Sequence, residues 1–498
     1  MNLEYLGAND KETLEKRLQV VASAGALSQS DDNAIITYEN HADFEENVKL
    51  AKRICNMRHM SISDHDYLVF ALDNVSAIVE QELIKHRLMS FTIKSRRYVD
   101  FRDVGYYVPT FKDDDGVVMD NNERLQGYYK KHMDKLFEKY KNLVDNGIHV
   151  EDARYILPYS FHSSIIFGCD ARELEKVTAS LLYGKLSKID ELHELGMKFE
   201  EIINTLVPYL APTLKKEEND VKYKKDFYLI DEAYKESDML ESKKLDGVKL
   251  IGDNETVTSL LTSDFKICVY YLMKKYNLPY ETAVENMHRL SERDPLFKMK
   301  LINKIVNGEE ERLLEQVNYH FEFPVSLAAL THFSRHRMQS INIPDFVPVK
   351  LDNYYIPEKL LPYRIEYDDI FKENKKMKEY FYNIGVREED LIYFHLAGNS
   401  FNISTNINAR EMLAMSNLRT CERTMKETRD IVNDMIKITD HYTPIISSFY
   451  GPSCETKHFC PEGKKHCPNM KEHLDNYSER MKRFIELEKE EEQVLKLK

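Results

Sequence analysis

A basic triplet that contains histidine occurs twice in this sequence, 250 positions apart. Residues 85–87 read Lys-His-Arg and residues 335–337 read Arg-His-Arg, and each triplet follows an apolar run and precedes a β-rich stretch. Residues 247–254 also echo residues 3–9, at nearly the same offset. Matched landmarks at a fixed offset indicate a duplicated domain, so the chain should fold as two similar halves.

The duplication sets the expected domain organisation. A chain of 498 residues is long enough for two domains of ordinary size. Gly (16) and Pro (15) are scarce, which favours long helices and few tight turns. We predict a first domain (copy one, residues 1–215), a charged linker (216–244), a second domain (copy two, 245–475) and a charged helical tail (476–498). Residues 3–6 read as a strand, and residues 45–56 and 122–145 read as helices.

Charge and hydropathy narrow the class of protein. The net charge of −14 argues against general affinity for nucleic acid or an anionic membrane. No apolar run approaches the roughly 18 residues of a membrane span, and the first residues lack a signal pattern. Seven cysteines, an odd number, do not suggest a disulfide framework in a chain of this size. We therefore expect a cytoplasmic protein without nucleic-acid or membrane partners.

The residues after the first triplet suit an anionic ligand. Seven residues separate the triplet from Ser95, which is followed by Arg96 and Arg97. Arginine makes planar, bidentate contacts to phosphate or carboxylate, and serine adds a small neutral donor. The alternative is a solvated basic helix end, because cations are favoured near a helix C-terminus. The second triplet favours the ligand-binding interpretation.

These motifs resemble the signature of the flavin-dependent thymidylate synthases, which is Arg-His-Arg, seven residues, then Ser. Residues 151–158 are similar to that family's Glu-x-Ala-Arg-x-x-Leu-Pro, and residues 417–423 to its Asn-Leu-Arg-x-x-x-(Arg/His). Asp170-Ala171-Arg172 and Asn408-Ala409-Arg410 both resemble its Asn-Ala-Arg. His59 matches the His of a Gly-His-x-(Ser/Thr) element, although Arg58 stands in place of the glycine.

The resemblance implies an α+β fold in each copy, with helices around a central, largely antiparallel sheet. It also implies reductive C5 methylation of dUMP to dTMP, with methylenetetrahydrofolate as the carbon donor, FAD as the cofactor and NADPH as the reductant. In the family the active sites lie at subunit interfaces of a tetramer. Two fused copies would then give a homodimer that forms a pseudo-tetramer.

Roles for individual residues follow from the same resemblance. Arg419 would stabilise charge on the uracil ring as hydride reaches C6, and His59 is a second catalytic candidate. The carboxylate of Glu151 and the guanidinium of Arg154 lie three residues apart, so on a helix the first can orient the second; an exposed ion pair without function is the alternative. The substrate-binding candidates are Ser95, Arg97, Glu151, Arg154 and Arg419, and the cofactor-binding candidates are Lys85, His86, Arg87, Arg335, His336, Arg337, Asn408 and Arg423.

Each copy departs from the family pattern where the other keeps it. Copy one has Leu181 in place of the family's substrate-binding Arg, and Asp170 in place of Asn. Copy two has Asp345 and Val347 at the positions of Ser95 and Arg97, and Asp390 and Tyr393 at those of Glu151 and Arg154. We therefore expect the two copies to divide the substrate-binding work. The alternatives are a catalytically decayed flavin- or nucleotide-binding sensor or scaffold, and C5 alkylation of a different pyrimidine nucleotide.

Three cysteines are clustered near the end of the sequence. They are Cys454, Cys460 and Cys467, and His458 and His466 lie among them. Four such ligands can close a tetrahedral zinc site. The spacing lacks the usual pair of ligands two to four residues apart. We therefore assign no metal, keep the three cysteines as weak candidates, and expect them to be structural or dispensable rather than catalytic.

Overall fold

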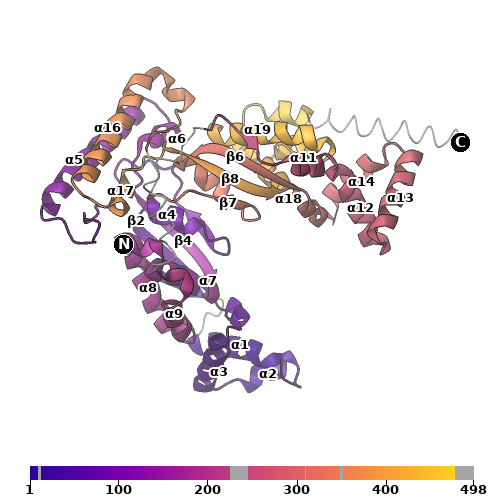
Figure 1. Cartoon of the computed structure of the whole chain (residues 1–498), viewed down its shortest axis with the longest axis horizontal. Coiled ribbons are helices and arrows are strands. Elements are labelled where there is room, and N and C mark those ends of the chain that lie inside the picture. The colour runs from indigo at the N-terminus through magenta and orange to yellow at the C-terminus, as the bar shows by residue number, and fades with distance from the viewer. Residues whose placement is uncertain (9–12, 225–244, 309, 348–350, 477–498) are drawn as a thin grey trace. The chain divides into compact units, whose positions relative to one another are not determined.

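The computed structural model describes residues 1–8, 13–224, 245–308, 310–347 and 351–476 (Figure 1). The chain divides into two compact units. The first unit comprises Met1–Ser242 and Asp345–Asn399, and the second comprises Lys243–Pro344 and Ser400–Lys498. Residues 345–399, which the sequence assigns to copy two, therefore pack within the first unit.

The first unit is built on a four-stranded antiparallel sheet in the order β1-β2-β4-β3. Alternate residues of β2 point to a buried face, because successive side chains of a strand point to opposite sides. Phe70 of β2 and Phe167 of β4 meet Phe199 of α8 on this face, with ring centroids 6.5 and 5.9 Å from Phe199. The strands are β1 (Asn2–Ala8), β2 (Tyr67–Ser76), β3 (Ser90–Ile93) and β4 (His162–Asp170).

The second unit repeats this sheet as β5-β6-β8-β7, again antiparallel throughout. Leu3 pairs with Leu72 in the first sheet, and Lys249 pairs with Glu322 at the matching position of the second. The strands are β5 (Lys249–Leu250), β6 (Asn318–Ser326), β7 (Ser340–Asn342) and β8 (Ser400–Asn408). The duplication and the predicted α+β class with antiparallel sheets are both confirmed.

The helices of the first unit surround its sheet and extend beyond it. They are α1 (Leu14–Leu27), α2 (Ala34–Asn40), α3 (Phe44–Asn56), α4 (Ala77–Ile84), α5 (Asn122–Asp145), α6 (Val150–Ala153), α7 (Ala171–Tyr183), α8 (Asp190–Leu206), α9 (Ala211–Glu217), α16 (Arg364–Asn383) and α17 (Glu388–Leu391). Short 3₁₀ helices η1 (Met60–His65), η2 (Arg154–Ile156) and η8 (Ile392–Phe394) join them. The predicted helix over residues 122–145 coincides with α5, and the one over 45–56 matches α3 within one residue.

The helices of the second unit are α11 (Asn254–Leu261), α12 (Ser263–Tyr276), α13 (Tyr280–Arg293), α14 (Phe297–Asn307), α15 (Leu327–Ser334), α18 (Ala409–Arg419), α19 (Lys426–Tyr442), α20 (Pro444–Ser447) and α21 (Ser453–Thr456). Short 3₁₀ helices η6 (Glu311–Gln316) and η9 (Gly463–Lys465) also belong to it. None of the helices in the described ranges combines the length and the apolar character that a membrane crossing needs.

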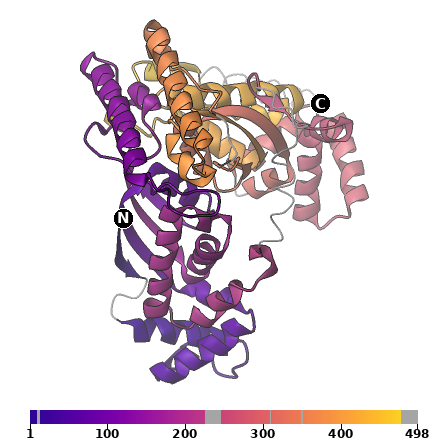
Figure 2. The same ribbon diagram turned by 60° about the vertical axis from the view of Figure 1, so that its left-hand side comes forward.

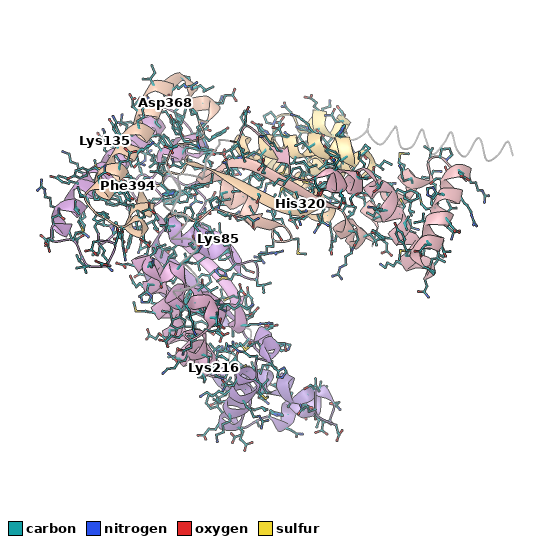
Figure 3. All side chains as sticks on the ribbon, viewed as in Figure 1. Lys85, Lys135, Lys216, His320, Asp368 and Phe394 are labelled. Carbon is teal, nitrogen blue, oxygen red and sulfur yellow. The ribbon has the colours of Figure 1, made fainter. Side chains whose placement is uncertain are left out.

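Helices α5 and α16 lie side by side in the first unit, although one comes from each copy (Figures 1 and 2). Lys135 of α5 pairs with Glu373 of α16 at 2.6 Å, and Figure 3 labels Lys135 and, on α16, Asp368. The ring of Phe111 contacts that of Phe381 with centroids 4.8 Å apart. This packing explains why part of copy two belongs to the first unit.

The predicted linker begins with structured residues. Helix α9 ends at Glu217, which is buried and forms an ion pair with Lys222 at 2.9 Å. Residues 225–244 lie outside the described residues, as does the predicted helical tail from residue 477 onward. The boundaries at 215, 244 and 475 therefore remain a prediction.

Candidate functional site

Both triplets stand at the end of a short helix that starts directly after a central strand. Lys85 is the C-cap of α4, and Arg335 is the C-cap of α15; Figure 3 labels Lys85. Cations are favoured there because the last carbonyls of a helix carry partial negative charge. Arg335 and Arg337 are exposed on either side of the buried His336, and Arg87 is exposed beside the half-buried His86.

Each triplet histidine faces a glutamate on the helix that follows the last long strand. His86 Nδ1 lies 3.4 Å from an oxygen of Glu173, and His336 Nδ1 lies 2.9 Å from an oxygen of Glu411. These glutamates stand in the first turns of α7 and α18. The contact repeats in both copies, so it belongs to the duplicated fold.

Asn408 holds the first turn of α18 in place as its N-cap. Its side-chain oxygen accepts the backbone N–H of Glu411 at 2.9 Å, and Asp170 accepts that of Glu173 at 2.8 Å in copy one. N-cap side chains satisfy backbone donors that have no partner within the helix. Asp and Asn serve this purpose equally well, so the exchange at residue 170 preserves the local fold.

In copy two the contacts continue to Arg419, the last residue of α18. Its Nε donates to Nε2 of His336 at 3.0 Å. Because Nε2 accepts, the ring proton sits on Nδ1 and is donated to Glu411. Burial lowers the pKa of His336, with Glu411 opposing this and Arg419 adding to it. Asn408, Glu411, His336 and Arg419 thus form one hydrogen-bonded chain around a neutral imidazole.

Copy one lacks the last member of this chain. Leu181 occupies the position that corresponds to Arg419 and is buried, with 2% of its surface exposed. It packs in α7 against α8, where an added Cβ on Gly196 would lie 2.9 Å from the Leu181 Cβ. An arginine could not occupy that apolar contact without burying its charge.

The residues predicted to bind the nucleotide phosphate meet in the first unit. The guanidinium of Arg97 forms an ion pair with the carboxylate of Glu151, and Ser95 Oγ accepts the backbone N–H of Arg97 at 3.3 Å. Arg154 Nε donates to the backbone carbonyl of Glu151 at 3.2 Å. The Glu151 carboxylate thus binds Arg97, and its role in orienting Arg154 stays a prediction; α6 ends at Ala153, and a 3₁₀ turn begins at Arg154.

Arg154 is a buried cation in this cluster. Only 3% of its surface is exposed, and burial lowers its pKa, with Arg96 contributing in the same direction. A nearby anionic group would oppose both effects, because an opposite charge stabilises the ionised form.

Arg96 differs from its neighbour, and the expectation that both guanidinium groups after Ser95 face a ligand is wrong for it. Its terminal nitrogens donate to the two carboxylate oxygens of Glu80 at 3.0 and 2.8 Å, and Ser163 donates to the same carboxylate at 2.7 Å. All of these groups are buried. Arg96 is therefore part of the interior of the first unit.

The substituted residues of copy two also serve the interior. Asp390 pairs with Arg387 at 2.8 Å and accepts the backbone N–H of Lys112 at 2.8 Å. Tyr393 donates to the buried carboxylate of Glu191 at 3.1 Å. These contacts explain why the positions of Glu151 and Arg154 carry Asp and Tyr in copy two. Asp345 is half-exposed and pairs with Lys185, and Val347 is partly buried.

His59 lies on the surface at the start of η1, and Arg423 is exposed beyond the end of α18. Within the described ranges, no hydrogen bond or ion pair joins His59 to another predicted site residue. Arg58 has φ of 65°, a left-handed conformation that glycine adopts most easily. Its ion pair with Glu217 holds the side chain, and this accounts for an arginine at the family's glycine position.

Sequence reasoning missed the two glutamates that hold the histidines. The signal was present, because both Asp170-Ala171-Arg172 and Asn408-Ala409-Arg410 are followed by Glu, and an N-cap residue with Glu three positions later is a capping box. It also missed two buried glutamates. Glu191 accepts hydrogen bonds from the backbone N–H of Ser76 at 2.8 Å and from its hydroxyl at 2.6 Å. Glu427 accepts the same two bonds from Ser326, at 2.7 and 2.6 Å.

Comparison with known proteins finds one family in both halves. The family described as thymidylate synthase complementing protein (Thy1) matches residues 12–208 and 261–445. A flavin-dependent thymidylate synthase of Geobacter sulfurreducens is 33% identical over 124 residues, covering 24% of this chain and 50% of its own. One from Thermococcus onnurineus is 31% identical over 163 residues (32% and 64%).

A longer match is to the flavin-dependent thymidylate synthase of Sulfurisphaera tokodaii, 26% identical over 208 residues, covering 41% of this chain and 77% of its own. The first two relatives are thus matched over half to two thirds of their length. A crystal structure of a UMP/dUMP methylase, PolB from Streptomyces cacaoi, bound with 5-Br dUMP, has a TM-score of 0.36 and 23% identity, covering 43% of this chain and 94% of that one. Since the family model matches most of the chain, in two successive regions, this protein belongs to the Thy1 family and carries two copies of its domain in tandem.

Proposed function

We propose that the protein is a flavin-dependent enzyme that methylates C5 of dUMP, with FAD as cofactor and with methylenetetrahydrofolate and NADPH as co-substrates. The observation that carries this proposal is the chain Asn408–Glu411–His336–Arg419, which links cofactor-binding and substrate-binding candidates through contacts of 2.9 to 3.0 Å. It is supported by the family membership and by the names of the relatives.

Arg419 would hold the pyrimidine ring. Negative charge develops on the uracil carbonyl oxygens as hydride reaches C6, and a fixed guanidinium stabilises it. The Nε of Arg419 is bound to His336, so the terminal nitrogens would face the ring. A neutral His336 can accept that hydrogen bond, whereas a protonated one would repel the guanidinium.

The basic residues would hold the phosphates of the substrate and cofactor. Arg97, Ser95 and the buried Arg154 suit the phosphate of dUMP. Arg335, Arg337 and Arg423 are exposed residues of the second unit, and guanidinium groups are suited to binding the pyrophosphate of FAD. When bound, FAD would supply the hydride in its reduced form, and NADPH would reduce the flavin again.

The thiols outside the C-terminal segment fit a reaction without a cysteine nucleophile. Burial raises the pKa of Cys55 and of Cys268 to about 12, and it raises the pKa of the Cys169 thiol further. A thiol must lose its proton to attack, so these three are inert near neutral pH. The family chemistry needs no such nucleophile.

A second candidate is a flavin- or nucleotide-binding sensor or scaffold without catalysis. The buried Leu181 favours it for copy one, because the uracil-facing arginine is absent there. A third reading, C5 alkylation of another pyrimidine nucleotide, uses the same residues.

Two measurements separate these functions. Purified full-length protein should be yellow, or should become so when FAD is added, and should release tritium from [5-³H]dUMP when methylenetetrahydrofolate and NADPH are present. Flavin absorbance without tritium release would support the sensor, and tritium release from labelled UMP alone would support the third reading. Absence of flavin binding would contradict both enzymatic functions. We also expect two chains per particle by light scattering.

A further inference from the structure

Three parts of the second unit that are separate in the sequence converge just beyond α18. The turn between α18 and α19 carries Glu422, and α21 carries Glu455. The third part is the helical stretch of residues 470–476, which carries His473. Asn469 Nδ2, just before this stretch, donates to the carboxylate of Glu422 at 2.9 Å. These contacts bring side chains of three chemical types into one place.

A carboxylate, a thiol and an imidazole meet there. Glu422, Cys467 and His473 each offer one ligand atom, and the three atoms lie within 4.8 Å of one another. Cys467 is buried, and the other two side chains are partly exposed. Carboxylate oxygen, thiolate sulfur and imidazole nitrogen are the ligands that protein zinc sites use. The cluster is therefore a candidate metal site by the identity of its groups as well as by their distances.

His473 is oriented as a metal-binding histidine is. Its Nδ1 lies 2.7 Å from an oxygen of Glu455, so a neutral ring carries its proton there. The other nitrogen, Nε2, then faces an oxygen of Glu422 at 3.2 Å. Among the residues that the structure describes, this buried nitrogen has no partner with the geometry of a hydrogen bond. Histidines that bind a metal almost always donate their other ring N–H to a carboxylate or carbonyl in this way.

We propose that Glu422, Cys467 and His473 bind one zinc ion, with water as the fourth ligand. Thiolate and imidazole favour zinc over magnesium and calcium, which prefer oxygen ligands. At the usual zinc bond lengths, two nitrogen or oxygen ligands of a tetrahedral ion are about 3.3 Å apart. The separation of 3.2 Å between His473 Nε2 and the Glu422 oxygen already matches this value.

The charges of the ligands balance that of the ion. Zinc binding releases the proton of the Cys467 thiol to solvent, and the resulting thiolate and the carboxylate of Glu422 together offset the two positive charges. His473 binds as a neutral ring. No oxidant or reductant takes part.

The ion would fasten the C-terminal segment, residues 453–476, to the turn that follows the Asn-Leu-Arg motif. The same segment is already bound to this motif at its other end, where Thr456 Oγ1 donates to Asn417 Oδ1 at 2.8 Å. Of the cysteines and histidines that the sequence spacing singled out, only Cys467 belongs to the proposed site. The other two ligands come into view only through the tertiary contacts.

The alternative is an ion-pair cluster without metal, in which a protonated His473 bridges Glu422 and Glu455. In that arrangement Cys467 plays no part, and no zinc is purified with the protein. The two arrangements therefore differ in the metal content of the wild type and in the effect of replacing the thiol.

The first test is the metal content of the full-length chain, purified under reducing conditions without chelator and measured by mass spectrometry. We expect one zinc per chain. Cys467→Ser and His473→Gln should each abolish bound zinc, whereas the matched controls Cys460→Ser and His466→Gln, in the same segment, should retain it. Glu455→Ala should weaken zinc binding by about tenfold to a hundredfold in competition with a chromophoric chelator, because it removes the carboxylate that orients the histidine.

Cobalt provides a readout that does not depend on the folding of any variant. Wild-type protein freed of zinc and reconstituted with Co²⁺ should show the charge-transfer band of a single thiolate and the ligand-field bands of a four-coordinate ion. The proposal is overturned if the wild type binds neither ion, or if it contains iron or copper in place of zinc. Zinc that is retained in Cys467→Ser, or lost in Cys460→Ser, would also overturn it.

Discussion

The Nε of Arg419 donates to Nε2 of His336 over 3.0 Å, and this contact joins the end of α18 to the triplet at the end of α15. The two residues are 83 positions apart in the chain. His336 is in turn fixed by Glu411, so one carboxylate sets the tautomer that receives the guanidinium. A buried histidine thereby determines where the guanidinium of Arg419, the proposed substrate-binding group, points.

Arg419→Lys should lower kcat/KM for dUMP tenfold to a hundredfold. Lysine keeps the charge but cannot donate to His336 and the pyrimidine ring at once, and a charge-assisted hydrogen bond is worth about 1.5–3 kcal/mol. The matched control is Arg410→Ala, on the same helix, where the guanidinium pairs with Glu315 at 2.7 Å on the surface. Steady-state tritium release checks both, and equal losses would contradict the assigned role.

Binding of dUMP should weaken only as the pH falls below the folded-state pKa of His336, which burial places under the usual value of about 6.5. The pKa of His336 is lowered in the folded protein, so its imidazole is neutral at about pH 6.5 and above. The hydrogen bond that this neutral ring accepts from Arg419 is lost as the pH falls through the folded-state pKa. Protonation would turn an N–H towards Arg419. His336→Gln can make both contacts without titrating, so calorimetry should show a flatter pH dependence for it than for the wild type.

The repeated sheet and its long helices were predictable because their patterns are local. Residues 122–145 carry a continuous helical pattern, and the echo of residues 3–9 placed β5 correctly. The pairing of Arg97 with Glu151 was not predictable, because it depends on how a loop and a four-residue helix meet in space. Helix periodicity instead suggested Glu151 with Arg154, and in the structure Arg154 Nε donates to the backbone carbonyl of Glu151.

The fate of Arg96 could not be read from sequence either. Adjacent arginines look equivalent in a motif. In the structure, however, the turn that follows β3 places Arg96 in the interior and leaves Arg97 partly exposed. The partner Glu80 lies in α4, which reads as an apolar helix apart from its buried polar residues.

Arg97→Ala should reduce dUMP affinity tenfold or more, while Asp345→Ala, at the position that corresponds to Ser95 in copy two, should change it less than twofold. Arg97 supplies a guanidinium that Glu151 keeps in place, whereas Asp345 pairs with Lys185 in a half-exposed position, where ion pairs contribute little. Calorimetric titration with dUMP measures both affinity and stoichiometry. Comparable affinity losses in the two variants would count against the assignment.

Glu80→Leu should destabilise the protein by about 3–5 kcal/mol, because it leaves the Arg96 charge buried without its carboxylate. The double variant Glu80→Leu/Arg96→Phe should recover most of that loss. Copy two carries the apolar residues Leu330 and Phe346 at the corresponding positions of the sequence. Urea unfolding of both variants and of Arg96→Phe completes the cycle, and simple additivity of the two single losses would refute the coupling.

Glu191 should make the protein less stable as the pH rises from about 4.3 towards 7. The carboxyl is fully buried and accepts from Ser76 and from Tyr393, and burial raises its pKa to about 7 against these donors. An unfolded glutamate ionises near pH 4.3, so between the two values the unfolded chain loses a proton that the folded protein keeps. The contribution to stability is therefore fully present below about 4.3 and falls by about 4 kcal/mol across this window, since each pKa unit corresponds to about 1.4 kcal/mol. Glu191→Gln should remove this slope, whereas Glu194→Gln, a half-exposed position on the same helix, should leave it unchanged. Unfolding free energies measured at pH 5 and pH 8 would settle the matter, and the same pH slope in the wild type and Glu191→Gln would show that Glu191 is ionised throughout.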